Sequence, residues 1–158
     1  MGTATPSRID AVEAQPKKSL TRFLPTVARV LMGALFLFAG LNGFLNFVPP
    51  PAKLPPEGAM AFSKAMMDTG YLFQLVKGTE VLVAVLLLAN RFVPLALALI
   101  APVLVNIFAF HAFLAPEGTG LAVVLLAIEI FLAWTYRAAF RPMLAMRATP
   151  SVTTREAP

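Results

Sequence analysis

The sequence predicts an all-α integral membrane protein, a four-helix bundle with a short amphipathic outer-surface helix in its first connection. Two observations predict this class. Apolar residues make up 58% of the 158 residues and charged residues only 13%, whereas a soluble domain of this size carries about a quarter charged residues. The apolar segments are also long and continuous and lack the strict alternation of strands, which argues against a β-barrel.

Four apolar segments are candidates for membrane-spanning helices, which need about 20 residues each. They cover about residues 27–48, 71–89, 92–114 and 119–136. Asn90-Arg91 makes a tight turn between the second and third segments. Trp134, Tyr136 and Arg137 place the end of the fourth segment at a membrane interface.

The first connection differs from the others because it is rich in proline. Residues 48–56 favour an extended polyproline segment. Residues 57–68 then predict an amphipathic helix, since Glu57, Lys64 and Asp68 fall within about 40° on a helical wheel and Phe62 and Met66 fall opposite. We expect this helix to lie flat at the outer surface, either as a packed loop helix or as a lid over a substrate.

The domain organisation is a polar N-terminal tail, a membrane domain and a C-terminal tail. These parts cover residues 1–22, 23–141 and 142–158. A cleaved signal peptide is the alternative interpretation of the start. The first apolar run begins only near Phe23 and continues to Val48, which favours a retained helix over the short apolar core of a signal peptide.

The distribution of basic residues predicts the orientation. Ten of the 13 lysines and arginines lie on the side of the two tails and the second connection. They are Arg8, Lys17, Lys18, Arg22, Arg29, Arg91, Arg137, Arg141, Arg147 and Arg155. Because the positive side of a membrane protein faces the cytoplasm, we expect a multi-pass protein of the bacterial cytoplasmic (inner) membrane with both termini cytoplasmic.

The heights of six polar residues inside the predicted spans can be compared, and each of the six needs a partner there. At about 1.5 Å per residue from the cytoplasmic ends, five of them come to heights of roughly 15–28 Å and Glu129 to about 12 Å. These five predict one polar pocket that opens outward, and they are Asn42, Lys77, Glu80, Asn106 and His111. Glu129 is expected to be neutral or to face the bundle.

Each of these residues also has a purely structural interpretation. Lys77 and Glu80 are three residues apart on one helix and can pair, either to fix helix packing or to serve a proton or ligand site. Asn106 can bond across to another helix or satisfy backbone near Pro102, which removes a helical hydrogen bond. His111 can be an ordinary interfacial residue. Gly33 and Gly40, seven apart, suit close helix approach.

The composition excludes several classes of chemistry. The chain has no cysteine and one histidine, so we expect no metal site and no cofactor held by the chain alone. The net charge of +5 comes from residues that flank apolar spans, which predicts membrane lipids rather than nucleic acid as partners. Soluble catalytic motifs are missing.

Several short motifs, in this order and spacing, resemble the DoxX family of small bacterial four-helix membrane proteins. They are Arg29-Val-Leu-Met-Gly33, Gly40-Leu-Asn-Gly-Phe44, Gly70-Tyr71, Lys77-Gly-Thr-Glu-Val-Leu82, Asn90-Arg-Phe-Val-Pro94, and Pro102-Val-Leu-Val-Asn106 to Phe110-His111. The resemblance covers about residues 29–141. It implies a membrane bundle linked to oxidoreductase complexes, with a quinone as a candidate cofactor and Asn42, Lys77, Glu80, Asn106 and His111 as matching positions.

Three functions are compatible with these observations. The first is a non-catalytic membrane subunit or anchor that supports a protein partner, with a quinone-linked oxidoreductase as a candidate. The second is a protein that binds or transports a small lipophilic molecule, in which case four helices favour a homo-oligomer. The third is a membrane oxidoreductase with Glu80 and His111 as proton carriers, so enzyme activity is left open.

Overall fold

The computed structural model describes residues 20–147, and within this range the chain is helical with no strand. The predicted all-α class is therefore confirmed for the described residues. The order of elements is η1 (Leu20–Phe23), α1 (Leu24–Leu45), α2 (Glu57–Asp68), α3 (Leu72–Leu88), α4 (Val93–Phe113), η2 (Pro116–Gly118), α5 (Thr119–Thr135) and α6 (Arg137–Phe140). α2 has the predicted bounds, and α3, α4 and α5 differ from the predicted segments by at most one residue at either end.

Three helices in the described range are long and apolar enough to cross a membrane. They are α1, α4 and the continuous segment Pro116–Thr135 that contains α5. α3 has 17 residues, and it joins this group only together with α2, from which it is bent by 92°. The fold thus has three such helices, or four if α2 and α3 are counted as one broken span.

α1 lies three residues earlier than the predicted segment 27–48, for reasons of local chemistry at both ends. Pro25 is in its first turn, where the missing N–H costs no helical hydrogen bond. Asn46 adopts a left-handed conformation (φ 49°) and its N–H bonds to the carbonyl of Asn42. This is a common way to end a helix, and the prolines that follow prevent α1 from continuing.

Bare glycine backbone on α1 allows α3 to pack closely against it. A Cβ atom at Gly40 would lie 2.7 Å from Cγ2 of Val81 and 3.1 Å from its backbone nitrogen. A Cβ at Gly33 would lie 2.9 Å from Cγ of Leu88. Small residues that let two backbones approach are typical of helix interfaces in membranes, as the spacing of these glycines predicts.

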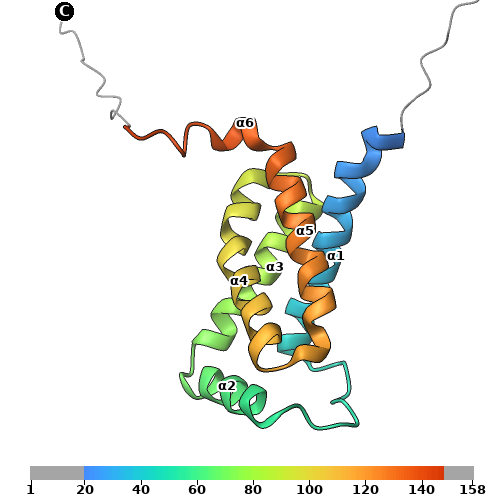
Figure 1. The fold of residues 1–158 in the computed structure, drawn as a ribbon, viewed down its shortest axis with the longest axis vertical. Helices are drawn as coiled ribbons and strands as arrows, with labels where there is room; N and C mark the ends of the chain where they lie inside the picture. The colour runs from blue at the N-terminus through green and yellow to red at the C-terminus, as the bar shows by residue number, and fades with distance from the viewer. Residues whose placement is uncertain (1–19, 148–158) are drawn as a thin grey trace, which may run out of the picture.

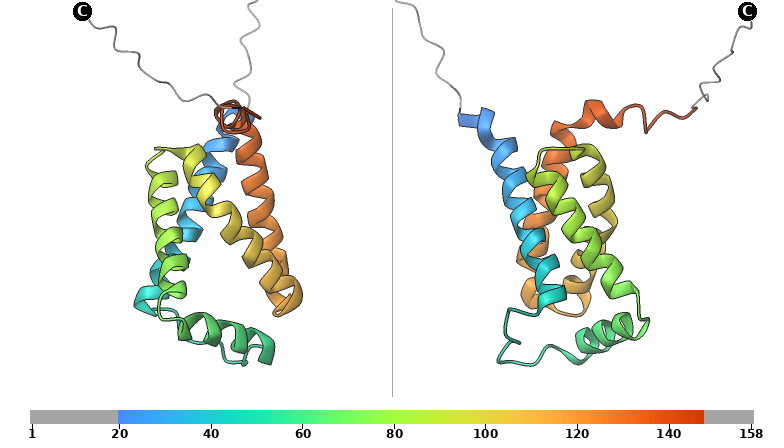
Figure 2. Two further views of the ribbon diagram at one scale, coloured as in Figure 1. Left: turned by 90° about the vertical axis from the view of Figure 1, so that its left-hand side faces the viewer. Right: turned by 180° about the vertical axis from the view of Figure 1, so that it is seen from behind.

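The two ends of the bundle are built differently (Figures 1 and 2). We call the end that holds the Asn90–Arg91 turn the closed end, and the end that α2 crosses the open end. η1 and α6 also lie at the closed end (Figure 1). Figure 2 shows α3 and α4 close together at the closed end and spread apart at the open end, where α2 lies across the gap.

The fully buried core occupies mainly the closed half of the bundle. On α3 it is confined to the last two turns, and on α4 it begins at the first residue. Its members are Ala28, Met32, Phe36, Val83, Ala84, Leu87, Val93, Ala96, Leu97, Ile100, Leu104, Leu125 and Leu132.

Arg29 is buried in this half and its Nη1 donates a hydrogen bond to the carbonyl of Leu87. That carbonyl belongs to the last turn of α3, the end of a helix that carries partial negative charge, and it also accepts a hydrogen bond from the N–H of Asn90. Arg29 therefore joins α1 to the end of α3. In the sequence, Arg29 counts only among the basic residues that predict the orientation, which does not reveal this structural role.

Candidate functional site

The candidate site is a pocket of about 250 Å³ in the gap between α3 and α4, covered by α2. We call it the α3–α4 pocket. α3 and α4 supply most of its walls and α2 supplies three residues. It is lined by Phe62, Ser63, Met66, Phe73, Val76, Lys77, Glu80, Val103, Asn106, Ile107, Phe110 and His111. Four of the five predicted site residues therefore share one pocket.

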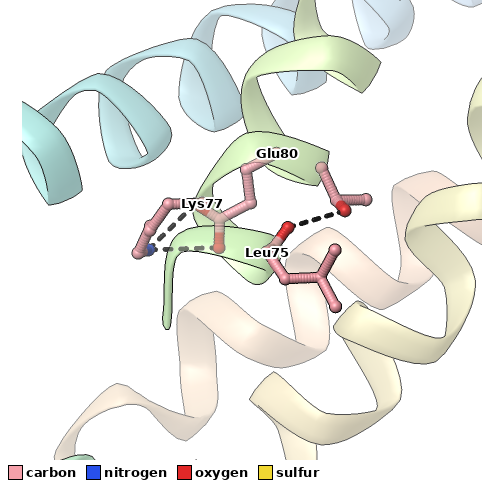
Figure 3. A network of polar contacts seen from close by, with 4 residues as sticks. Leu75, Lys77 and Glu80 are labelled. Atoms are coloured by element: carbon pink, nitrogen blue, oxygen red, sulfur yellow. Dashed lines mark hydrogen bonds and ion pairs between the residues drawn. The ribbon is translucent and has the colours of Figure 1, made fainter. Parts of the chain in front are cut away.

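Lys77 and Glu80 form an ion pair inside this pocket (Figure 3). The Lys77 Nζ lies 2.9 Å from Oε2 and 3.1 Å from Oε1 of Glu80. The Glu80 side chain is 3% exposed and that of Lys77 is 20% exposed. The pair follows from the spacing of three residues on one helix, and it gives the buried carboxylate the partner that a low-dielectric environment requires.

The aliphatic stem of Lys77 lies on the bare backbone of Gly43. A Cβ atom at Gly43 would overlap the Cγ and Cδ atoms of Lys77. The Nζ atom also lies 5.9 Å from the centre of the Phe73 ring, within the range of a cation–π contact. Gly43 and Phe73 thus fix the position of the ammonium group beside Glu80.

Asn106 brings an amide group to the pocket from α4. It lies one turn after Pro102, and Asn106 itself is exposed along the pocket wall. Pro102 interrupts the helical hydrogen bonds of α4, and the lining residues of this helix begin directly after it, at Val103. On α4, the pocket lining therefore starts directly after the residue that interrupts the helical hydrogen bonds.

His111 lies at the mouth of the pocket with its ring held in place. The Nδ1 atom is 3.1 Å from the carbonyl oxygen of Ala115, and a Cβ atom at Gly118 would overlap the ring. Because a carbonyl oxygen can only accept, this bond places a proton on Nδ1. In the neutral ring, Nε2 is then a hydrogen-bond acceptor.

A second pocket of about 350 Å³, the loop pocket, adjoins the first at the open end. Residues of the proline-rich connection, α2 and the α4–α5 turn line it. It shares Ser63, Phe110 and His111 with the α3–α4 pocket. The rings of Phe62 and Phe110 are 5.4 Å apart, so α2 rests on α4 where the two pockets meet.

Two predicted polar residues lie outside both pockets. Oδ1 of Asn42 accepts a hydrogen bond of 2.8 Å from the N–H of Val48, so this side chain stabilises the end of α1 and the chain that follows. Glu129 is 7% exposed and faces the bundle, as its apolar neighbours predict. Its Oε2 atom has no hydrogen-bond partner among the described residues.

Sequence reasoning missed the contribution of α2 and the aromatic rings to the site. Ser63 brings a hydroxyl group, and Phe62, Phe73 and Phe110 bring flat apolar surfaces. The wheel of α2 already contained a signal, because it places Phe62 and Met66 on the face that turns toward the bundle. The pairing of that face with α4 depends on tertiary packing that one sequence does not contain.

The pocket combines aromatic walls with an ammonium donor, a carboxylate acceptor, an amide and an imidazole acceptor. This composition suits a molecule with an apolar body and a small polar head group. No group of three or more histidine, aspartate or glutamate side chains within residues 20–147 is arranged to hold a metal ion.

Comparison of the chain with models of protein families, with curated proteins and with solved structures found no match. The resemblance to the DoxX family therefore has no support from these comparisons and stays a prediction from the motifs.

Proposed function

We propose that this protein crosses the membrane four times and binds a small lipophilic molecule with a polar head group in the α3–α4 pocket. The proposal rests on one observation: one pocket with aromatic walls is lined by Lys77, Glu80, Asn106 and His111. Polar groups are expensive inside a membrane and mark binding sites or pathways there. A bundle that needed only an ion pair for packing would not require the amide and the imidazole beside it.

The four-span part of the proposal takes α3 as a full span with α2 flat at the surface. η1 and α6 lie at the same end of the bundle (Figure 1), which an even number of crossings requires. Most basic residues of the described range belong to that end, and the proposed location is the bacterial cytoplasmic membrane with this end inside. Reporter fusions at Met1 and Pro158 should both report a cytoplasmic location, and a periplasmic signal from either terminus would contradict four spans.

The donors and acceptors define what the head group must offer. Lys77 and the Asn106 amide donate to carbonyl or hydroxyl oxygens, and Glu80 and Nε2 of His111 accept from hydroxyl groups. A flat ring would lie against the Phe73 or Phe110 side chains. The residues therefore fit a quinone, which is one member of this class, and Lys77 and Asn106 would hold its carbonyl oxygens.

Such a ligand would enter sideways from the lipid, because α3 and α4 diverge toward the open end (Figure 2). The loop pocket would give the polar head group a separate path to water. This path would pass Ser63, Phe110 and His111, which line both pockets. In this arrangement α2 divides a lipid-side entrance from a water-side entrance.

Cysteine labelling tests the pocket directly, since the chain has no native cysteine. Val103→Cys lies in the pocket wall, whereas Val105→Cys lies two residues away on the exposed outer face of α4. A water-soluble thiol reagent should label position 103 faster than position 105 in membranes. Equal rates would show that the α3–α4 pocket has no connection to water.

The ligand is tested by its loss from a matched pair of variants. Mass spectrometry of protein purified in mild detergent should detect a small molecule bound to the wild type and to Val105→Ala. Glu80→Gln should have lost most of it. Retention of the same molecule by Glu80→Gln and by Asn106→Ala would contradict binding in this pocket.

A second candidate function is a non-catalytic membrane subunit for a partner, with a quinone-linked oxidoreductase as the candidate partner. It is favoured by the DoxX-like motifs and by the lack of cysteine, because redox chemistry at the pocket would need groups from the ligand or the partner. Cross-linking in native membranes followed by mass spectrometry tests it. Recovery of the chain alone, or only with itself, would argue against this role.

A further inference from the structure

An apolar groove of about 400 Å³ lies on the outside of the closed end, where α5 passes into α6. We call it the α6 groove. It is lined by Ile130, Ala133, Trp134, Arg137, Phe140 and Leu144. None of these residues lines the α3–α4 pocket or the loop pocket, so the groove is separate from the candidate site.

The groove exists because the chain turns away from the axis of α5 at its end. α6 and the residues after it leave the bundle sideways (Figure 1), while Phe140 packs back against the core. The wall below this turn is left uncovered: Trp134 is 69% exposed and Ile130 is 63% exposed. A large aromatic ring at this level is typical of the membrane–water interface.

Arg137 brings a basic group to the lining of the groove. Arg137 and Arg141 are exposed and lie four residues apart. The Nη1 atom of Arg137 donates a 3.1 Å hydrogen bond to the carbonyl of Trp134, and its guanidinium lies 5.2 Å from the centre of the Trp134 ring. A guanidinium has five N–H donors, of which this bond uses one, and its position is fixed by the ring and the carbonyl together.

We propose that the α6 groove binds one anionic phospholipid, with an acyl chain along Ile130 and Trp134 and the phosphate at Arg137 and Arg141. The walls are hydrocarbon and the lining residues include no acidic side chain, which suits a lipid tail. The oriented guanidinium at the rim is complementary to phosphate, which it binds in a bidentate manner. The inference rests on the proposed insertion in the membrane but not on any ligand of the α3–α4 pocket.

Trp134 provides the assay because it is the only tryptophan in the chain. The full-length protein is reconstituted in phosphatidylcholine vesicles in which a minor fraction of the lipid carries bromine on the upper acyl chain. Brominated phosphatidylglycerol should quench Trp134 fluorescence at a lower fraction than brominated phosphatidylcholine. Arg137→Gln removes one basic contact near the membrane surface. Its preference for phosphatidylglycerol should therefore be about fivefold weaker than that of the wild type.

Two variants separate a defined site from diffuse charge. Arg137→Lys keeps the charge and should retain part of the preference. Arg91→Gln removes a charge at the same end of the bundle but outside the groove and should retain all of it. An equal loss in Arg91→Gln would overturn the site in favour of general attraction between the basic end and anionic lipid.

The wild-type measurement decides the inference even if a variant fails to fold. Equal quenching by both brominated lipids would overturn it and indicate ordinary surrounding lipid. Protein that floats with the vesicles but is not quenched by either lipid would also overturn it, because the groove would then be covered by protein. Protein that does not float with the vesicles at all would instead contradict the proposed membrane insertion.

Discussion

The same helices run through the closed and open halves of the bundle, but they form a packed core in the closed half and line a pocket in the open half. In the closed half, the last turns of α3 and the first half of α4 pack into a core with almost no exposed atoms. In the open half, the same two helices separate and their facing residues line a pocket. The change occurs near Glu80 on α3 and Pro102 on α4.

This contrast shows that the surroundings of a polar residue determine its role. In the closed half, buried Arg29 joins two helices through a backbone carbonyl, so a charge serves packing. In the open half, Lys77 and Glu80 are paired with each other but also border open space. A polar residue beside a pocket can act on another molecule, whereas one enclosed by packing cannot.

Removal of the Glu80 carboxylate should give the largest effect, because Glu80 both pairs with Lys77 and lines the α3–α4 pocket. Glu80→Ala leaves the Lys77 ammonium without its partner, and an uncompensated buried charge costs about 3–5 kcal/mol. Partial escape of the long Lys77 side chain toward the surface would reduce this. The expected result is a clear loss of thermal stability in detergent.

The double variant Glu80→Gln with Lys77→Met separates structure from function. It should recover most of the stability that Glu80→Gln loses, because no buried charge is left unpaired. If the pair also contacts a ligand, the double variant should be stable and yet bind no ligand. Glu80→Ala with unchanged stability and unchanged bound molecules would contradict both roles.

Gly40→Ala should have the next largest effect, since it forces α1 and α3 apart. The new Cβ would meet the backbone of Val81 as well as its side chain, and overpacking of this kind costs about 1–3 kcal/mol. Gly78→Ala is the matched control on α3, because its Cβ would meet nothing within 4 Å. Chemical denaturation should show that Gly40→Ala is less stable than Gly78→Ala. Equal stabilities would mean that the α1–α3 contact is loose.

Truncation on α4 should have a smaller effect that depends on which half is truncated. Leu97→Ala, in the closed half, should cost about 1–2 kcal/mol, less than in a soluble core, because a chain unfolded in lipid does not expose the side chain to water. Val103 is only partly buried at the edge of the core and borders an existing pocket, so Val103→Ala should cost less. A larger loss at Val103, measured by the same denaturation, would contradict an open pocket there.

Loss of the Lys53–Glu117 ion pair should have the smallest effect. The two side chains are 3.2 Å apart but 84% and 70% exposed, and such surface pairs contribute about 0–1 kcal/mol. Lys53→Gln should therefore leave the melting temperature almost unchanged. A marked drop would show that this pair, rather than the contact of Phe62 with Phe110, holds the proline-rich connection over the open end.

The helices could be predicted from the sequence because their signals are local. The wheel and prolines define α2, the Asn90–Arg91 turn separates α3 from α4, and three-residue spacing pairs Lys77 with Glu80. The predicted heights also grouped five polar residues into one pocket, and four of the five share a pocket in the structure. Such inferences need only the geometry of single helices.

The remaining features depend on contacts between helices, which one sequence does not specify. Asn42 has the right height for the pocket, yet its side chain bonds to the N–H of Val48. A signal was available, since Asn42 is followed by Asn46 and then by prolines, a pattern typical of a helix end. Arg29 gave a similar signal, because it lies inside the predicted first span and a charge there needs a partner.

The packing of the Lys77 stem on Gly43 has a consequence for how the sequence can evolve. The two positions are coupled by volume and not by charge, because a Cβ at Gly43 would occupy the space of the Lys77 methylenes. In related sequences, a larger residue at position 43 should therefore occur together with a shorter residue at position 77. Covariation of this pair would identify chains that have given up the ammonium group while keeping the helix contact.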